Sequence, residues 1–139
     1  MFDFLENYEQ QGHFFFERGD RLSQVSRDVP EAPGVYLIYR LAHGSIDLVY
    51  IGKSGTLLQD GSFRNQLLRK RLNNQQEKGI KRQTFFDQKM KEDGIEAFDI
   101  YWYVTFDENH FDLPGFVEGQ LIQAHFDVFG TLPEWNREY

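Results

Sequence analysis

Residues 33–52 read PGVYLIYRLAHGSIDLVYIG. Two runs in this stretch, Val35–Tyr39 and Asp47–Ile51, are rich in β-branched and aromatic residues and have the length of β-strands. The segment AHGS between them, residues 42–45, is typical of a turn. We therefore predict a β-hairpin that ends at Gly52.

Downstream of the hairpin, helical and strand patterns alternate. Apolar residues recur at helical spacing after Ser62, and serine commonly caps helix N-termini. Pro114 suits the first turn of a last helix and Gly130 suits its end. The predicted order is helix 63–77, helix 84–92, strand 98–105 and helix 114–129. We expect an α/β sandwich around a small, mainly antiparallel sheet of three strands, with strand 98–105 at its centre.

Residues 1–32 show no such regularity. They contain a short apolar run at Phe14–Phe16 and a short helical pattern between Asp20 and Arg27. We predict an N-terminal extension that packs on a single domain formed by residues 33–139, because 139 residues suit one hydrophobic core better than two.

Composition excludes several classes of function. The chain has no cysteine, which excludes disulfides, thiol catalysis and cysteine-ligated zinc. No uncharged apolar run is long enough to cross a membrane, and the acidic N-terminus does not resemble a signal peptide. We expect a soluble protein located in the cytoplasm.

The net charge of −7 is unevenly distributed along the chain. The window from Lys53 to Lys91 holds ten basic and three acidic residues and carries +7, whereas the rest of the chain carries −14. A basic segment on an acidic body is expected of a face that binds a polyanion, although two solvated helices would produce the same pattern.

The hairpin carries the most specific motif. Gly34-Val35-Tyr36 on the first strand and Val49-Tyr50-Ile51-Gly52 on the second resemble the paired signature of the GIY-YIG nuclease superfamily. The resemblance covers roughly residues 33–136 and implies a small three-stranded nuclease fold. Leu68-Arg69-Lys70-Arg71-Leu72 looks like the arginine helix of that family.

The resemblance implies a site. Arg71 matches the functional arginine, Glu118 the metal-binding glutamate and Asn136 an asparagine near the end of the domain. Gln75 stands where some members place a histidine, and it cannot act as acid or base. The catalytic set predicted in this way, supported by Gly34, Gly52, Gln75 and Asn136, is Tyr36, Tyr50, Lys53, Arg71 and Glu118.

The chemistry of these residue types agrees with that set. Hydrolysis of a phosphodiester needs an activated water and a clamp for the developing negative charge. Tyr36 and Tyr50 lie on neighbouring strands, and a phenol becomes a useful base only if nearby cations lower its pKa from about 10. We favour Tyr36 as the base with Tyr50 positioning the water, and the reverse order is open. Two core tyrosines would give the same pattern.

Arg71 lies at the margin of the apolar stripe, where a guanidinium can bind phosphate through two N–H groups, and we favour it over Arg69. Glu118 suits one Mg²⁺ or Mn²⁺, since Mg²⁺ often takes only one or two protein carboxylates. His125 follows on the same helix, where packing is the commoner role. The residues expected to contact nucleic acid outside the site are Arg64, Arg69, Lys70, Lys78, Lys81 and Arg82.

The predicted function is metal-dependent endonucleolytic cleavage of nucleic acid, with DNA favoured over RNA. The first alternative is a catalytically silent nucleic-acid-binding module of the same fold. The second is a protein-interaction domain whose basic face meets an acidic partner. A homodimer is compatible with the sequence.

Overall fold

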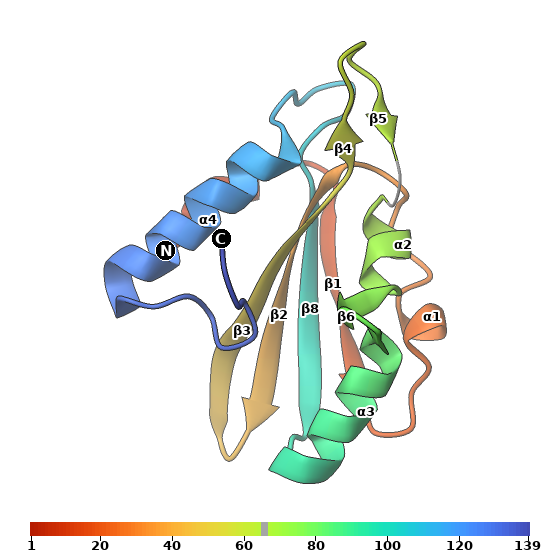
Figure 1. Ribbon diagram of the computed structural model, residues 1–139, viewed down its shortest axis with the longest axis vertical. Coiled ribbons are helices and arrows are strands. Elements are labelled where there is room, and N and C mark those ends of the chain that lie inside the picture. The colour runs from red at the N-terminus through yellow and green to blue at the C-terminus, as the bar shows by residue number, and fades with distance from the viewer. Residues whose placement is uncertain (65–66) are drawn as a thin grey trace.

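The computed structural model describes residues 1–64 and 67–139. Within these residues an antiparallel sheet with the order β1-β8-β2-β3 lies between two sets of helices (Figure 1). Its strands are β1 (Gln11–Glu17), β2 (Gly34–Ala42), β3 (Ser45–Ser54) and β8 (Ala97–Val104). The helices are η1 (Asp3–Asn7), α1 (Leu22–Val25), α2 (Leu68–Leu72), α3 (Arg82–Asp93) and α4 (Pro114–Phe129). The short strands are β4 (Thr56–Leu57), β5 (Phe63–Arg64), β6 (Gln75–Glu77) and β7 (Ile80–Lys81).

The α/β class and the antiparallel sheet are confirmed, but the sheet of the described chain has four strands where three were predicted. The additional strand, β1, comes from the predicted extension and pairs with β8 from Gln11 to Glu17. Without it, β8 would expose a row of unpaired backbone groups at a sheet edge. The first 32 residues therefore complete the sheet as well as packing on it.

The β2–β3 hairpin forms as predicted, and its register places Tyr36 opposite Gly52 and Tyr50 opposite Ile38. Helices cover both faces of β2, which explains why five consecutive residues, Gly34–Ile38, are buried. β3 is one edge of the sheet, and β1 is the other.

The two signature glycines lie where other backbones or rings approach closely. A Cβ atom at Gly52 would lie 2.4 Å from Cζ of Tyr36 and 2.6 Å from its hydroxyl oxygen. A Cβ atom at Gly34 would lie 2.0 Å from the carbonyl oxygen of Tyr103. Neither position accommodates a side chain, so both glycines are required by packing between and across the strands.

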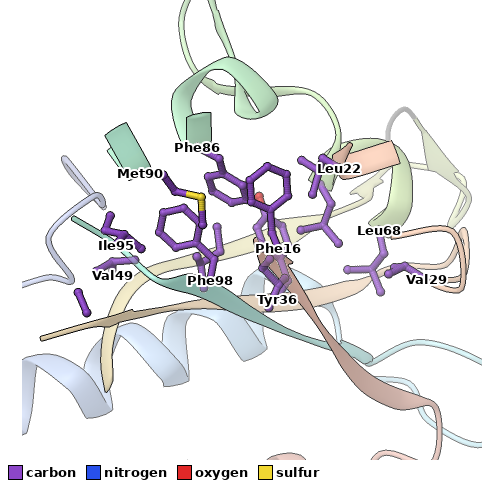
Figure 2. Close-up of a cluster of buried hydrophobic side chains, with 14 of the residues drawn as sticks. Phe16, Leu22, Val29, Tyr36, Val49, Leu68, Phe86, Met90, Ile95 and Phe98 are labelled. Atoms are coloured by element: carbon purple, nitrogen blue, oxygen red, sulfur yellow. The ribbon is translucent and has the colours of Figure 1, made fainter. Parts of the chain in front are cut away.

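Two hydrophobic layers flank the sheet. One lies beneath α1, α2 and α3, where the rings of Phe16, Phe86 and Phe98 pack together with centroid distances of 5.1 Å and 4.4 Å to Phe86 (Figure 2). The other lies beneath α4 and contains Val117 and Leu121. Helices of the two layers therefore approach the free edge of β3 from opposite faces (Figure 1).

The predicted helix 63–77 is confirmed at Leu68–Leu72 and is wrong at its two ends, while its residues 65–66 lie outside the described residues. Phe63 belongs to β5 and packs edge-to-face on Phe106 at 4.9 Å, and the residues after Asn73 turn into the β6–β7 hairpin. Helix α2 keeps only Leu68–Leu72. Ser62 bonds to Asp60 instead of capping a helix.

The remaining predicted elements are found with small shifts. Helix α3 runs from Arg82 to Asp93, β8 from Ala97 to Val104, and α4 from Pro114 to Phe129 as predicted. Gly94 and Gly130 end the two helices in the left-handed conformation. None of the helices in the described residues is long and apolar enough to cross a membrane.

Gly52→Ala should destabilise the protein by about 2 kcal/mol or more, because the added methyl group forces the buried ring of Tyr36 to move. Urea unfolding measures the change. Gly115→Ala in α4 is the matched control, since its Cβ would meet nothing closer than 4.0 Å, and it should alter the free energy of unfolding by less than about 1 kcal/mol. Equal effects of the two substitutions would contradict the packing role of Gly52.

Candidate active site

A cleft with a volume of about 810 Å³ lies beside the C-terminal half of β3. β3 and the residues after it supply Tyr50, Lys53 and the segment 54–56, α2 supplies Lys70 and Arg71, and α4 supplies Glu118. The lining residues thus come from parts of the chain far apart in sequence. The hairpin, the arginine helix and the last helix, each singled out by the sequence, meet here.

The cleft is cationic. Lys53, Lys70 and Arg71 face a single carboxylate, that of Glu118. In the part of the chain that the structure describes, none of the three cations has a carboxylate oxygen within 4.0 Å. Their charges are therefore available to an anion that enters the cleft.

Glu118 is half-buried, and its carboxylate is poorly solvated. Burial raises the pKa of Glu118 above its ordinary value, and the nearby charges of Lys53 and Arg71 oppose that rise only in part. A carboxylate in this state gains from a positively charged ligand, because such a ligand replaces the solvation that the fold removes.

Tyr36 and Tyr50 lie side by side, as predicted, with ring centroids 6.0 Å apart. Only Tyr50 lines the cleft. Tyr36 is fully buried behind it, and its hydroxyl accepts a hydrogen bond from Nη2 of Arg82 at 3.0 Å. The preference for Tyr36 as the base that contacts water therefore does not fit the geometry, and Tyr50 is the tyrosine that can touch a ligand.

Nearby cations act on the pKa of Tyr50 in the expected direction, but burial outweighs them. Burial, followed by the neighbouring Tyr36, raises the pKa of Tyr50 to about 12, although the charges of Arg82 and Arg71 act in the opposite direction. At neutral pH the protein alone therefore presents Tyr50 as a neutral phenol, which can both donate and accept a hydrogen bond.

Arg82 is not on the nucleic-acid-binding surface, where the sequence analysis placed it. Its side chain is fully buried behind the two tyrosines. The signal was present in the sequence: Arg82, Phe86 and Met90 recur every four residues along α3, and all three are buried. An arginine on the apolar stripe of a helix is a buried arginine.

Gln75 does not support the cleft. Its side chain is exposed in β6 and accepts a hydrogen bond from the backbone of Gly79. The next residue, Gln76, is the buried one, and its Oε1 accepts from Nε of Arg82 at 2.9 Å. Because β6 is a strand and not the helix that was predicted, the side chains at 75 and 76 point in opposite directions.

Asn136 braces the edge of β3 beside the cleft. The N–H of Ile51 donates to Oδ1 of Asn136 at 3.0 Å, and Nδ2 of Asn136 donates to the carbonyl of Ile51 at 2.9 Å. The side-chain amide thus imitates a neighbouring strand at an edge that otherwise lacks one. The chain after α4 returns across this edge (Figure 1).

The other candidate contacts are dispersed. Arg69 donates to the carbonyl of Arg27, whereas Arg64 on β5 and Lys78 are exposed away from the cleft lining. Lys81 lines a second depression that holds three further cations, supplied by Arg18, Arg21 and Lys91. His125 is buried, and its Nδ1 lies 2.8 Å from the carbonyl oxygen of Thr131, which makes it a packing residue.

A metal would have one protein carboxylate here. The described residues contain no group of three or more histidine, cysteine or acidic side chains that could hold an ion. Among the residues that the structure describes, no hydrogen bond to Glu118 lowers its pKa, so its oxygens are open to a cation. Mg²⁺ commonly completes its shell with water and substrate phosphate, so a single carboxylate fits this ion.

Comparison of the chain with protein-family models, curated proteins and solved structures found no match. The resemblance to the GIY-YIG superfamily therefore rests on the motif residues alone.

Glu118→Gln should make the protein more stable than the wild type at pH 7. Because the folded pKa of Glu118 is raised, the native state binds the proton more tightly, and the wild type loses stability as the pH rises through that pKa. Urea unfolding should show the difference at pH 7, and the two proteins should converge near pH 4. The exposed Glu108 provides a control, Glu108→Gln, that should show no such trend. A Glu118→Gln variant that is less stable than the wild type at pH 7 would contradict the raised pKa of Glu118.

Proposed function

We propose that this protein is a metal-dependent endonuclease of the GIY-YIG type that hydrolyses phosphodiester bonds in nucleic acid, with DNA favoured over RNA. The observation that carries the proposal is the cleft itself. Tyr50, Lys53, Arg71 and Glu118, selected from the sequence by the motif, line one cationic cavity although they come from three separate elements.

The cleft residues suit the charges of the reaction. A phosphodiester brings one negative charge, and more develops on its oxygens as water attacks phosphorus. Arg71 can offer two parallel N–H donors to those oxygens, and Lys53 adds a second positive charge from β3. The bond from phosphorus to the leaving 3′ oxygen breaks, a proton from the water ends on that oxygen, and the products carry 5′-phosphate and 3′-hydroxyl groups.

Glu118 would hold one Mg²⁺ or Mn²⁺. When bound, such an ion offsets phosphate charge and makes water more acidic. Lys53 lies along the first turn of α4, with its Cδ 4.0 Å from the Cβ position of Gly115, and therefore stands between β3 and the turn that precedes Glu118. The positive charge of Lys53, which we assign to phosphate binding, therefore acts close to the carboxylate.

Tyr50 is the residue we assign to the attacking water. Its neutral hydroxyl can orient the water at pH 7, and it can accept the proton only in its minor phenolate form. This assignment replaces Tyr36, which we place behind the site as the support of Tyr50.

One observation favours the silent binding module instead. The raised pKa of Tyr50 and the burial of Tyr36 leave neither tyrosine as a ready base at neutral pH, whereas Lys53, Lys70 and Arg71 line the cleft as cations that could bind phosphate. This alternative predicts that the protein binds DNA without cutting it under any metal condition.

Nicking of supercoiled plasmid in Mg²⁺ or Mn²⁺ tests the proposal. Arg71→Ala should lower the rate by about 10²–10³-fold, because the phosphate loses its donors in the transition state. Glu118→Ala should abolish the dependence on the metal. Arg69→Ala is the matched control, since Arg69 lies two residues away on α2 and bonds to the carbonyl of Arg27 outside the cleft. Binding without nicking by the wild type would establish the silent module.

The nicking rate should also rise with pH. Because the pKa of Tyr50 is raised to about 12, the phenolate fraction grows about tenfold per pH unit between pH 7 and pH 9. If Tyr50 takes the proton, the wild-type rate follows this slope and Tyr50→Phe flattens it. A slope that persists in Tyr50→Phe would assign the proton transfer to another group and leave Tyr50 with an orienting role only.

A further inference from the structure

Arg82, the first residue of α3, has the largest fully buried side chain among the described residues. Its guanidinium donates to four acceptors. Nε bonds to Oε1 of Gln76 at 2.9 Å, and Nη2 bonds to the hydroxyl of Tyr36 at 3.0 Å. Nη1 bonds to the backbone carbonyls of Arg71 at 3.2 Å and Leu72 at 3.1 Å.

All four acceptors are neutral. In the described part of the chain no carboxylate lies within 4.0 Å of Arg82, and its charge instead lies 5.0 Å from the ring centroid of Tyr36 and 5.5 Å from that of Tyr50. A buried guanidinium without an anion is costly, and an apolar side chain of similar volume would remove that cost. Stability alone therefore does not explain an arginine at this position.

The acceptors of Arg82 belong to two parts of the protein that lie at the cleft, the end of α2 and the tyrosine pair. Arg71 and Leu72 form the C-terminal end of α2, and the carbonyl that Arg82 binds at position 71 belongs to the residue whose side chain lines the cleft. Tyr36 packs against Tyr50, which also lines the cleft. One side chain thus connects the phosphate-binding arginine with the tyrosine pair.

We propose that Arg82 is the positioning residue of the cleft: its single guanidinium fixes the tyrosine pair relative to Arg71, and its uncompensated positive charge supports negative charge in the cleft from behind Tyr50. The catalytic consequence of this proposal rests on the proposed nuclease function, whereas the geometric and electrostatic parts do not.

Electrostatics at Tyr50 supports the proposal. The charge of Arg82 is the largest influence that lowers the pKa of Tyr50, ahead of that of Arg71, although burial keeps the pKa raised overall. Removing the charge should therefore make the phenol of Tyr50 still less acidic. If Arg82 served only through its hydrogen bonds, replacing it would change the stability of the protein without a specific effect on the pKa of Tyr50.

The test compares two variants. Arg82→Met keeps most of the side-chain volume and removes the charge, whereas Arg82→Lys keeps the charge and loses the set of four hydrogen bonds. Fluorinated tyrosine is incorporated throughout the chain, because its more acidic phenol titrates at a pH where the protein is folded. Tyr50 is assigned by its loss in Tyr50→Phe, and its titration is followed by fluorine NMR. Gln76→Leu is the control that removes one hydrogen bond and no charge.

The proposal predicts a higher titration midpoint for Tyr50 in Arg82→Met and a midpoint near that of the wild type in Arg82→Lys and Gln76→Leu. It also predicts that Arg82→Met nicks plasmid at least tenfold more slowly at saturating DNA, with partial recovery in Arg82→Lys. An unchanged Tyr50 midpoint in folded Arg82→Met would overturn the proposal, whatever the nicking assay shows.

Tyr36→Phe keeps the proposal falsifiable if Arg82→Met does not fold, because it removes only the hydroxyl that Arg82 binds. The side-chain nitrogen signals of Arg82 should then shift, and nicking should fall although Tyr36 does not line the cleft. Unchanged signals and unchanged nicking would overturn the proposal. If the wild type never nicks DNA, the nuclease function fails, and the titration of Tyr50 still decides the role of Arg82.

Discussion

The ring of Tyr36 occupies the space that a side chain at position 52 would fill, and the candidate site depends on this contact. It fixes the register of β2 against β3, because only a glycine can stand opposite Tyr36. With that register, Tyr50 lies over the tyrosine ring on one face of β3, and Lys53 lies along α4 on the other. A slip of one residue would exchange the two faces, turning Tyr50 towards α4 and Lys53 away from it.

The site lies at a sheet edge for a physical reason. The free edge of β3 leaves room for helices from both layers to approach one another, and α2 and α4 bring Arg71 and Glu118 together there. An open edge exposes backbone groups that invite pairing with another chain, and the amide of Asn136 occupies part of it. Beside the cleft, Lys53, Lys70 and Arg71 favour a polyanion over a β-strand as the occupant.

The sequence predicted the elements that local patterning determines. The hairpin follows from two apolar runs around a polar turn, and α4 follows from a proline and a glycine at its ends. Of the helix predicted at 63–77 only Leu68–Leu72 forms, because long-range contacts outweigh the apolar spacing at its ends: Phe63 packs on Phe106, and Asn73 bonds to Ser26. Helical propensity contributes too little per residue to resist such contacts.

The candidate site was predictable where residue type and motif coincide, as for Arg71 and Glu118, which both line the cleft. It was not predictable where burial decides the role. Tyr36 and Tyr50 have the same chemistry, and only the packing of α3 over the hairpin places one behind the other. Arg82 was counted as a surface charge because the predicted helix began at residue 84, which left out its four-residue spacing to Phe86 and Met90.

Paramagnetic relaxation by Mn²⁺ tests the central claim, that the cleft binds a divalent metal through Glu118, most directly. In two-dimensional NMR spectra, trace Mn²⁺ should broaden the backbone amide signals around Lys53 and Glu118 before all others, and Glu118→Gln should abolish this effect. Broadening that begins elsewhere, or that persists unchanged in Glu118→Gln, would contradict the account.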